Sequence, residues 1–337
     1  MNRFAASSGK APLLDLRSVS RRFSRPLDLA AKIARALGSR QKEQVVHAVD
    51  DVSLSVHEGE VLGLVGESGC GKSTLGRMMA GILSPSEGKI LYRGMDVNTL
   101  SPEQRREADL KIQMIFQDPF ASLNPRYRVR DIIGEAPRVH RVVPAKEMDA
   151  FLDGIMLKVG LDPEYGQRYP HQFSGGQRQR IGIARALAVR PECIVCDESV
   201  AALDVSIQAQ IINLFIRLRE ELNLTYVFIS HDISVVEHIS DRVVVMYLGR
   251  VVESADTEEL FARPAHPYTH ALLREVPRLD SRHQSFRPVS GEIPSPLNPP
   301  RGCHFHPRCE RAMPICREQA PVRREIVPGH QAACHLL

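Results

Sequence analysis

The sequence predicts an α/β fold in which a mainly parallel sheet lies between helices, with a small Cys-containing unit at the C-terminal end. Three observations lead to this prediction. Short apolar runs alternate with longer amphipathic runs between residues 60 and 248, as in sheets with helical crossovers. A glycine-rich loop near residue 66 joins an expected strand to an expected helix. Beyond residue 277 the helical periodicity fades and prolines become frequent.

Length and composition agree with one large domain and a smaller appendage, which we expect at residues 1–276 and 277–337. The chain has 337 residues, of which 43% are hydrophobic and 25% charged, so it can bury a sizeable core. Its net charge of +4 is too small to indicate nucleic acid as an obligate partner. No apolar run approaches the roughly 18 residues of a membrane span, and residues 1–10 lack a signal-peptide core. We therefore expect a cytoplasmic protein.

The expected elements follow one another in an order typical of this fold class. Strands are predicted at 13–23 and 47–56, separated by an insert with an amphipathic run at 27–37. That run is interpreted as a small surface helix or, alternatively, as a contact with a membrane surface or a partner. Further elements are a strand at 61–65, a helix at 73–83, helical patterns at 118–172, a helix at 176–189, a strand at 193–197, a helix at 206–222, and strands at 225–230 and 243–248.

The segment GESGCGKST has the spacing and the strand-to-helix context of a P-loop, whose backbone N–H groups hold phosphates. Its glycines are expected where a side chain would occupy the place of the phosphate, and Cys70 is interpreted as a filler of the loop. Lys72 should reach the β and γ phosphates of ATP, and the Ser73 hydroxyl should bind Mg²⁺. The predicted ATP-binding residues of this segment are Gly66, Glu67, Ser68, Gly69, Cys70, Gly71, Lys72, Ser73 and Thr74.

A pair of carboxylates follows the apolar run CIVC, as expected for a buried strand that delivers them at its C-terminal end. Asp197 is predicted to hold Mg²⁺ through water, and Glu198 to orient and deprotonate the attacking water. Cys193 and Cys196 on the same strand should point to different faces, as thiols of the core.

A second candidate anion site precedes the helix at 176–189, where Ser174, Gly175, Gly176 and Gln177 lead into its first turn. The alternative is an ordinary N-cap followed by flexible glycines. Two phosphate-binding helix starts in one chain suggest that two chains share each nucleotide.

Together these motifs resemble those of ABC ATPases, over the chain from about residue 13 to the C-terminus. The resemblance implies a P-loop NTPase of the ABC type, with a helical subdomain at about 118–185 and a signature motif that serves the ATP of the partner subunit. Gln117 is similar to the glutamine that touches Mg²⁺ and senses the membrane partner. Asp204 resembles the D-loop aspartate, and His231 the histidine that contacts the γ phosphate. Phe23 is similar to the residue that stacks on adenine.

The phrases at 117–126, 168–187 and 266–273 narrow the resemblance to F-type ATPase subunits of oligopeptide and dipeptide importers. The resemblance implies ATP-driven uptake of peptides or a related small solute. It also implies a second, D-type ATPase subunit in a heterodimer, two membrane permease subunits, an extracytoplasmic solute-binding protein and a peripheral position at the cytoplasmic face of the cell membrane. The permease-facing surface is expected to include residues 118–135; the alternative is that the apolar side chains of this segment, such as Leu123 and Tyr127, form the core of the helical subdomain.

Two alternative functions are less consistent with the sequence, which also departs from the family pattern at two positions. An ABC-type ATPase acting on nucleic acid or ribosomes would tend to carry two ATPase halves or a long coiled-coil insertion, and neither is found in the sequence. A catalytically poor regulatory partner would not need Glu198 for turnover. Ser199 and Ala201 stand where close relatives usually have Pro and Ser, and we expect altered loop stiffness with no loss of activity.

Four cysteines of the C-terminal region, Cys303, Cys309, Cys316 and Cys334, are separated by five, six and seventeen residues. A small Pro-rich unit has too little core to be stable alone and needs a cross-link, here called a staple, which in a reducing compartment is a metal. Wide, irregular spacing favours a cluster over zinc, and the family resemblance implies 4Fe-4S. Free thiols remain an alternative, as does Zn²⁺ bound with one of four histidines, His304, His306, His330 or His335.

Overall fold

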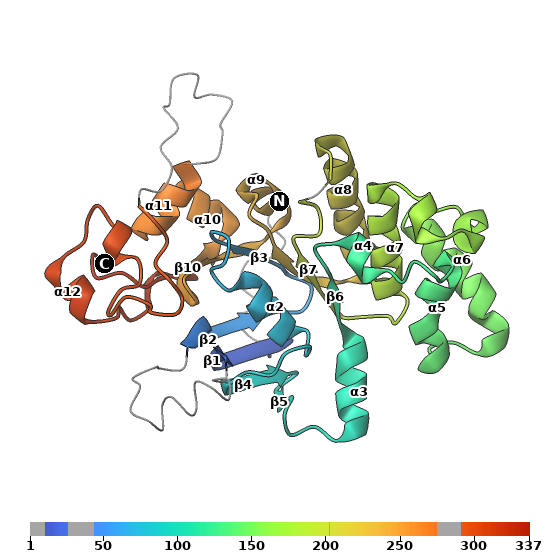
Figure 1. The fold of residues 1–337 in the computed structure, drawn as a ribbon, viewed down its shortest axis with the longest axis horizontal. Helices are drawn as coiled ribbons and strands as arrows, with labels where there is room; N and C mark the ends of the chain where they lie inside the picture. The colour runs from blue at the N-terminus through green and yellow to red at the C-terminus, as the bar shows by residue number, and fades with distance from the viewer. Residues whose placement is uncertain (1–10, 26–43, 202, 275–290) are drawn as a thin grey trace, which may run out of the picture.

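The structure is a computed structural model and describes residues 11–25, 44–201, 203–274 and 291–337. The helix expected at 27–37 lies outside these residues. Two sheets form the body of the molecule (Figure 1). The larger has eight strands in the order β11-β12-β10-β9-β3-β8-β7-β6, and the smaller has four in the order β2-β1-β4-β5.

The centre of the large sheet is parallel, as the alternation of elements predicted. Its parallel strands are β6 (Ile112–Ile115), β7 (Cys193–Asp197), β8 (Thr225–Ile229), β3 (Val61–Val65) and β9 (Arg242–Tyr247). Every residue of β3, β7 and β8 is buried, because helices or the second sheet cover both faces. Cys193 and Cys196 are fully buried in two different hydrophobic clusters, so the prediction that they are core thiols on opposite faces is confirmed.

The small sheet lies below the large one in Figure 1 and shares a hydrophobic cluster with it. All pairings within it are antiparallel. Its strands are β1 (Leu14–Arg25), β2 (Gln44–Val56), β4 (Glu87–Tyr92) and β5 (Met95–Asp96).

Helices follow the parallel strands near the predicted positions. The first is α2 (Lys72–Met79), which ends four residues before the predicted end at 83 because Gly81 adopts a left-handed φ of 71°. Other helices along the chain are α3 (Pro102–Lys111), α7 (Gly175–Leu187), α8 (Val205–Leu222), α9 (Ile233–Ile239), α10 (Thr257–Ala262) and α11 (Pro267–Arg274).

A helical region between β6 and α7 occupies the end of the molecule opposite the C-terminal tail (Figure 1). Its buried side chains, including Ile133 and Leu152, belong to the same hydrophobic cluster as Ile181 of α7. The elements are α4 (Pro119–Ser122), α5 (Val129–Val139), η1 (Ala145–Glu147), α6 (Met148–Lys158), η2 (Pro163–Gln167) and η3 (Pro170–Gln172).

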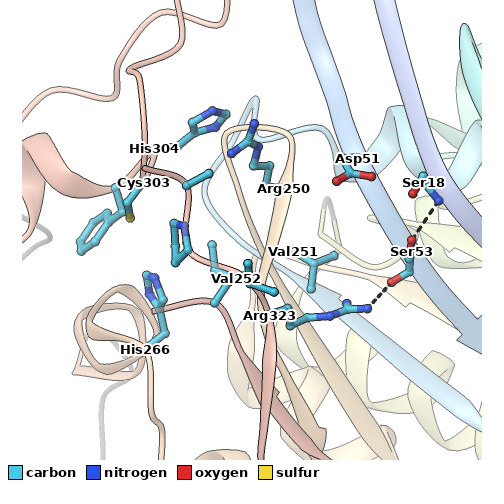
Figure 2. A pocket seen from close by; sticks show the side chains of 15 residues that line it. Ser18, Asp51, Ser53, Arg250, Val251, Val252, His266, Cys303, His304 and Arg323 are labelled. Carbon is cyan, nitrogen blue, oxygen red and sulfur yellow. Dashed lines mark hydrogen bonds between the residues drawn. The ribbon is translucent and has the colours of Figure 1, made fainter. Parts of the chain in front are cut away.

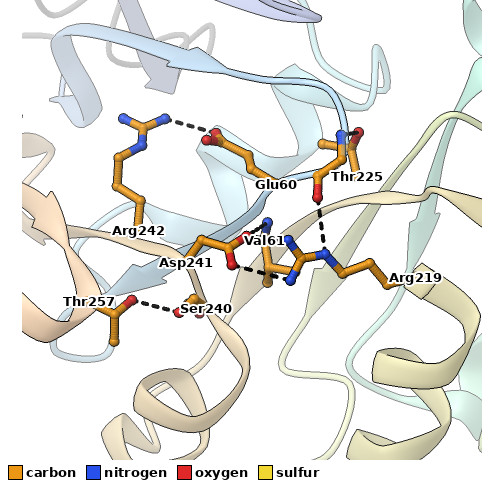
Figure 3. A network of polar contacts seen from close by, with 9 residues as sticks. Glu60, Val61, Arg219, Thr225, Ser240, Asp241, Arg242 and Thr257 are labelled. Atoms are coloured by element: carbon orange, nitrogen blue, oxygen red, sulfur yellow. Dashed lines mark hydrogen bonds and ion pairs between the residues drawn. The ribbon is translucent and has the colours of Figure 1, made fainter. Parts of the chain in front are cut away.

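A polar network fixes the beginning of β3, the strand that leads into the P-loop (Figure 3). The carboxylate of Asp241 accepts a hydrogen bond from the Val61 N–H (2.8 Å) and pairs with the Arg219 guanidinium of α8. Arg219 also donates to the Gly59 carbonyl (3.0 Å), and the Gly59 N–H donates to Thr225 of β8 (2.9 Å). Strand β3 is therefore tied to its two neighbours and to α8 before the loop begins.

The C-terminal tail, residues 291–337, joins the large sheet. Strand β10 (Arg250–Asp256) runs antiparallel to β9. Strand β12 (His330–Ala332) of the tail pairs with β10, with Ala332 opposite Glu253. Strand β11 (Arg324–Val327) completes the edge. The helical segments of the tail are short, namely η4 (His306–Arg308) and α12 (Pro314–Glu318), as the density of prolines predicted.

Candidate functional site

The P-loop connects β3 to α2, and two of its glycines are required by neighbouring backbone. A Cβ atom on Gly66 would lie 2.2 Å from the Met246 carbonyl oxygen, and one on Gly71 would lie 2.2 Å from the Ala48 carbonyl oxygen. Gly71 also has a φ of +105°, which favours glycine. Packing against β2 and β9 therefore demands these glycines, a reason different from the phosphate clearance inferred from the sequence.

The start of α2 is available to an anion. Its N-cap, Gly71, offers no side-chain hydrogen bond, and the first turn carries no acidic residue, so its N–H groups and the positive end of the dipole are not neutralised there. The Lys72 ammonium is buried and donates to the carbonyls of Gly66 (2.7 Å) and Glu67 (3.0 Å). Cys70 is buried beneath the loop, in agreement with its interpretation as a filler.

Two of the three residues predicted at Mg²⁺, Ser73 and Asp197, meet at the carboxyl end of β7, whereas the third, Gln117, is bonded to Glu198. The Ser73 hydroxyl donates to a carboxylate oxygen of Asp197 at 2.7 Å. Burial raises the pKa of Asp197, whereas this hydrogen bond lowers it. A hydroxyl and a carboxylate facing the same point form an oxygen donor set of the kind that Mg²⁺ prefers.

Glu198 lies at the centre of a second group of predicted residues. Its carboxylate accepts a hydrogen bond from the Gln117 amide (2.6 Å) and lies 3.5 Å from Nδ1 of His231. Three loops, after β6, β7 and β8, thus bring together an amide, a carboxylate and an imidazole. Asp204 is exposed before α8 and, within the part of the chain that the structure describes, takes no part in these contacts.

The second predicted phosphate-binding helix start is well formed at α7. The Ser174 hydroxyl accepts from the Gln177 N–H (3.4 Å), and the Gln177 side chain accepts from the Ser174 N–H (3.0 Å), which makes a capping box. A Cβ on Gly176 would lie 2.4 Å from Ile207 of α8. Phe23, at the end of β1, is 40% exposed, with the Arg21 guanidinium 4.8 Å from its ring centre.

Comparison with known proteins shows to which family the chain belongs. The family described as "ABC transporter" matches residues 49–201, which contain the P-loop, Gln117, the signature motif and the acidic pair. The "Oligopeptide/dipeptide transporter, C-terminal region" family matches residues 252–316. The chain is 56% identical over 295 residues to the "Oligopeptide transport ATP-binding protein AppF" of Bacillus subtilis, covering 86% of the chain and 90% of that relative.

The chain belongs to the ATP-binding proteins of ABC transporters. The "Dipeptide transport ATP-binding protein DppF" of Haemophilus influenzae is a further relative, 49% identical over 87% of this chain and 90% of its own length. Solved ABC ATPases share the fold. The structure of cbiO1 from Clostridium perfringens, part of the transporter complex cbiONQ, has a TM-score of 0.61 and 27% identity over 75% of this chain and 92% of its own.

A dimeric ATP-binding cassette in a post-hydrolysis state, bound to ADP and Pi, superposes equally well, with a TM-score of 0.61 and 26% identity over 72% of this chain and 98% of its own. The ABC-type nucleotide-binding fold and the ATPase class expected from the sequence are thereby confirmed. Among the described residues, no helix is long and apolar enough to cross a membrane.

The four cysteines of the tail of this ABC ATPase, Cys303, Cys309, Cys316 and Cys334, line one small cavity. Burial raises the pKa of Cys303 to about 11. Within residues 291–337 and the other described ranges, no three His, Cys, Asp or Glu side chains are arranged to hold a metal ion. The expected 4Fe-4S cluster therefore gains no support from a preformed ion site.

The histidines weighed as zinc ligands already have hydrogen-bond partners. His304 and His306 face the carbonyls of Leu248 (3.0 Å) and Cys303 (2.9 Å). His330 is buried against Glu253 at 2.7 Å, and His335 faces the Gln319 carbonyl (2.9 Å).

A cavity of about 440 Å³ separates the tail from β2 and β10 (Figure 2). Arg250 and Arg323 line it, together with His304 and Cys303. No P-loop residue takes part in its lining, so this cavity is distinct from the nucleotide site of the ABC fold.

Two contacts of the P-loop were not predicted from the sequence. Arg308 of the tail forms a bidentate ion pair with Glu67, with distances of 2.6 and 2.9 Å. The hydroxyl of Tyr268 accepts a hydrogen bond from the Glu67 N–H (2.9 Å). These partners lie 241 and 201 positions away in the sequence. Tyr268 belongs to the phrase at 266–273 that indicated the family, but nothing in that phrase indicates a contact with the P-loop, and Arg308 belongs to no motif identified from the sequence.

Proposed function

We propose that this ABC ATPase powers an importer of oligopeptides, dipeptides or a related small solute. In this proposal it forms a heterodimer with a D-type ATPase subunit and docks on two membrane permease subunits at the cytoplasmic face of the cell membrane. An extracytoplasmic binding protein delivers the solute. The match of the C-terminal family and the transport functions named for relatives at about 50% identity support this assignment.

The observation that carries the catalytic part of the proposal is the convergence of side chains around Glu198. In this interpretation the Glu198 carboxylate orients and deprotonates the attacking water, while His231 contacts the γ phosphate. Gln117, now bonded to Glu198, is placed to exchange that contact for Mg²⁺ when nucleotide binds. Asp204 would act across the dimer interface, which agrees with its exposure and its separation from the trio.

Lys72 and Ser73 have roles that follow from the start of α2. With MgATP bound, Lys72 would leave the carbonyls of the loop for the β and γ phosphates. Ser73 and Asp197 would hold Mg²⁺, which neutralises charge on the phosphates. Phe23 is proposed to stack on adenine with its exposed ring.

The signature motif is proposed to bind the nucleotide held by the partner's P-loop. Ser174 is exposed, and the first turn of α7 carries no acidic side chain that would neutralise the positive end of the helix. Two complete ATP sites then require two subunits. ATP binding would close the dimer, and hydrolysis would reopen it.

Docking on a permease is proposed for the segment after Gln117. Leu123 is buried in the core, whereas Tyr127 is 47% exposed on the same segment. An exposed aromatic ring beside polar residues is typical of a protein contact surface.

A 4Fe-4S cluster is proposed for the cysteine cavity. All four thiols border that single cavity. Their wide, irregular spacing in the sequence suits a cluster, whose own size spreads its four thiolate ligands, better than it suits zinc. The cluster would staple a tail that has few core residues.

Affinity purification of the tagged chain from detergent-solubilised membranes tests the transport assignment. We expect a second ABC ATPase, two membrane permeases and a solute-binding protein in the eluate, with ATPase activity well above that of the chain alone. Recovery of ribosomal proteins or nucleic acid without any membrane protein would contradict the assignment and favour the alternative class of ABC ATPase.

Anaerobic purification and metal analysis test the cluster. We expect brown protein with about four irons per chain and a broad absorbance shoulder near roughly 400 nm. Cys309→Ser should bleach it, whereas Cys193→Ser, in the sheet core, should not. Stoichiometric zinc without iron would overturn the cluster and retain the staple, and absence of both metals with a folded tail would overturn both.

A further inference from the structure

The tail reaches the P-loop through a buried ion pair. The guanidinium of Arg308 binds both carboxylate oxygens of Glu67, the first residue after Gly66 in the loop. The Arg308 side chain is 3% exposed and that of Glu67 19%. A bidentate pair with so little access to water fixes both partners in direction as well as distance.

An aromatic cluster makes this junction rigid. Phe305 of the tail packs with edge-on or tilted geometry against Tyr247 and Tyr268, with ring centres 5.2 and 5.3 Å apart. The same Tyr268 accepts the hydrogen bond of the Glu67 N–H, and the Tyr247 ring lies 5.9 Å from the Arg308 guanidinium. All three rings are buried in the main hydrophobic core. A shift of the tail is therefore transmitted to the loop.

Glu67 connects this junction to the phosphate-binding lysine. Its backbone carbonyl accepts a hydrogen bond from Lys72 at 3.0 Å, while its carboxylate is held by Arg308. The charge of Glu67 also matters, because a carboxylate on a loop that surrounds the phosphates repels them unless a cation compensates it. Arg308 supplies that cation from the tail.

The cysteines lie immediately beside these residues. Cys303 and Cys309 flank the short segment that carries Phe305 and Arg308. Cys303 borders both the cysteine cavity and the 440 Å³ cavity of Figure 2. The larger cavity therefore leads to the Cys303 side chain. Cys309 follows Arg308 directly in the chain, so a change in the state of this thiol acts on the residue next to the arginine.

We propose that Arg308 is a positioning residue for the P-loop, through which the cysteine tail sets the affinity of the site for MgATP. This inference rests on the ATP site and the cysteine staple of the proposed function. In the intact tail Arg308 neutralises and orients Glu67. A tail that loses its staple withdraws Arg308, and the free Glu67 carboxylate weakens the binding of the phosphates.

The first test measures binding of MgATP to the full chain with a fluorescent ATP analogue. Arg308→Gln should weaken binding about fivefold or more, the usual range for coupled sites. Arg324→Gln, an exposed arginine on β11 of the same tail, should bind like the unmodified chain. Arg308→Lys keeps the charge without the bidentate geometry and should give an intermediate affinity. Equal affinities for Arg308→Gln and Arg324→Gln would overturn the proposal.

A double-mutant cycle separates positioning from ordinary stabilisation. Removing the unpaired carboxylate should restore affinity, so Arg308→Gln with Glu67→Gln should bind MgATP more tightly than Arg308→Gln alone. A salt bridge that only stabilises the fold predicts that the double variant regains thermal stability while the MgATP affinity of the folded chain does not change between the variants, so the unfolding temperature is measured beside the affinity. A double variant that binds as weakly as the single one would contradict the mechanism.

The link to the cysteines is tested in the same cycle. Cys309→Ser should weaken MgATP binding in the unmodified background and have little further effect when Glu67 is Gln. An equal loss in both backgrounds would overturn the route through Arg308. Failure of the unmodified chain to bind MgATP would refute the ATP site itself, whereas loss of binding in Lys72→Ala alone, with every Arg308 variant unaffected, would refute only the positioning role.

Discussion

The position of Glu198 depends on its backbone conformation as well as on its side-chain partners. Its φ of +46° is in the left-handed region, which costs a residue with a side chain about 1 kcal/mol or more. The N–H of Glu198 nevertheless donates to the Ile229 carbonyl of β8 at 3.0 Å, which compensates part of this cost. The strained turn directs a carboxylate that is 16% exposed toward Gln117 and His231. Strain maintained at such a position is typical of a catalytic residue.

Replacement of this carboxylate separates binding from chemistry. Glu198→Gln keeps the shape and can still accept the hydrogen bond from Gln117, but it removes the base. We expect the ATPase rate of the assembled transporter to fall about a hundredfold or more, with the affinity for MgATP retained. Glu221→Gln, on the surface of α8, is the matched control. Turnover equal to that of the control would exclude Glu198 as the base.

At the residue scale, the sequence predicts the place of a residue best when that place depends on neighbours in the chain. Lys72 and Ser73 open α2 shortly after the end of β3, so the strand end and the helix start fix their place, while their roles stay predictions. The pair formed by Arg308 and Glu67 could not be predicted in this way. Its partners are brought together by tertiary packing, including that of Phe305 against Tyr247, and no local pattern encodes that contact.

At the scale of elements, the tail depends on one close approach between two of its segments. The N–H of Cys303 donates to the Cys316 carbonyl at 2.8 Å. Gly302 precedes this bond with a φ of +70°, and a Cβ there would lie 2.4 Å from the same carbonyl oxygen. The glycine thus allows two of the four cysteines to be brought together.

Gly302→Ala is expected to loosen this region. Gly329→Ala is the control, because Gly329 has a similar φ of +81° but nothing within 4 Å of its Cβ position. Both variants bear the strain of a left-handed alanine, about 1 kcal/mol, and only Gly302→Ala adds a collision. Thermal unfolding and the rate of thiol labelling at Cys303 and Cys316 measure the difference. Equal labelling rates in the two variants would contradict a structural role for this approach.

The strands of the large sheet differ in how well the sequence predicts them. Strands β3, β7 and β8 are continuous buried runs, and such runs are recognisable without a partner. The exposed strand β11 and the three-residue β12 have no comparable pattern. They are strands because β10 offers an edge for pairing, which only the folded sheet provides.

At the scale of the whole molecule, the chain carries two helix starts that are proposed to bind phosphate, at α2 and at α7. The P-loop is completed by β2, β9 and the tail, whereas the signature motif packs against α8. Different neighbours hold the two helix starts, as expected if each serves a different nucleotide in a dimer. A solved ATP-binding cassette of the same fold is a dimer bound to ADP and Pi.

The capping box of α7 has a structural twin that allows a controlled test. Ser101 and Gln104 form the same box at α3, and both serines are exposed. Loss of either cap should cost about 0.5–2 kcal/mol of stability. Only Ser174→Ala should also reduce turnover of the assembled transporter, while binding to its own P-loop is kept. Comparable ATPase rates for Ser174→Ala and Ser101→Ala would refute the shared site.

The ion pair joins Glu67 and Arg308, which are 241 positions apart, so the two residues are synthesised at different times. A ribosome that adds about 5–20 residues per second needs roughly 10 to 50 seconds to pass from the loop to its arginine. During that interval the nascent P-loop lacks its counter-charge, while much of the parallel sheet can already assemble. If Arg308 positions the loop as inferred above, firm binding of nucleotide would begin only after the tail has emerged and folded.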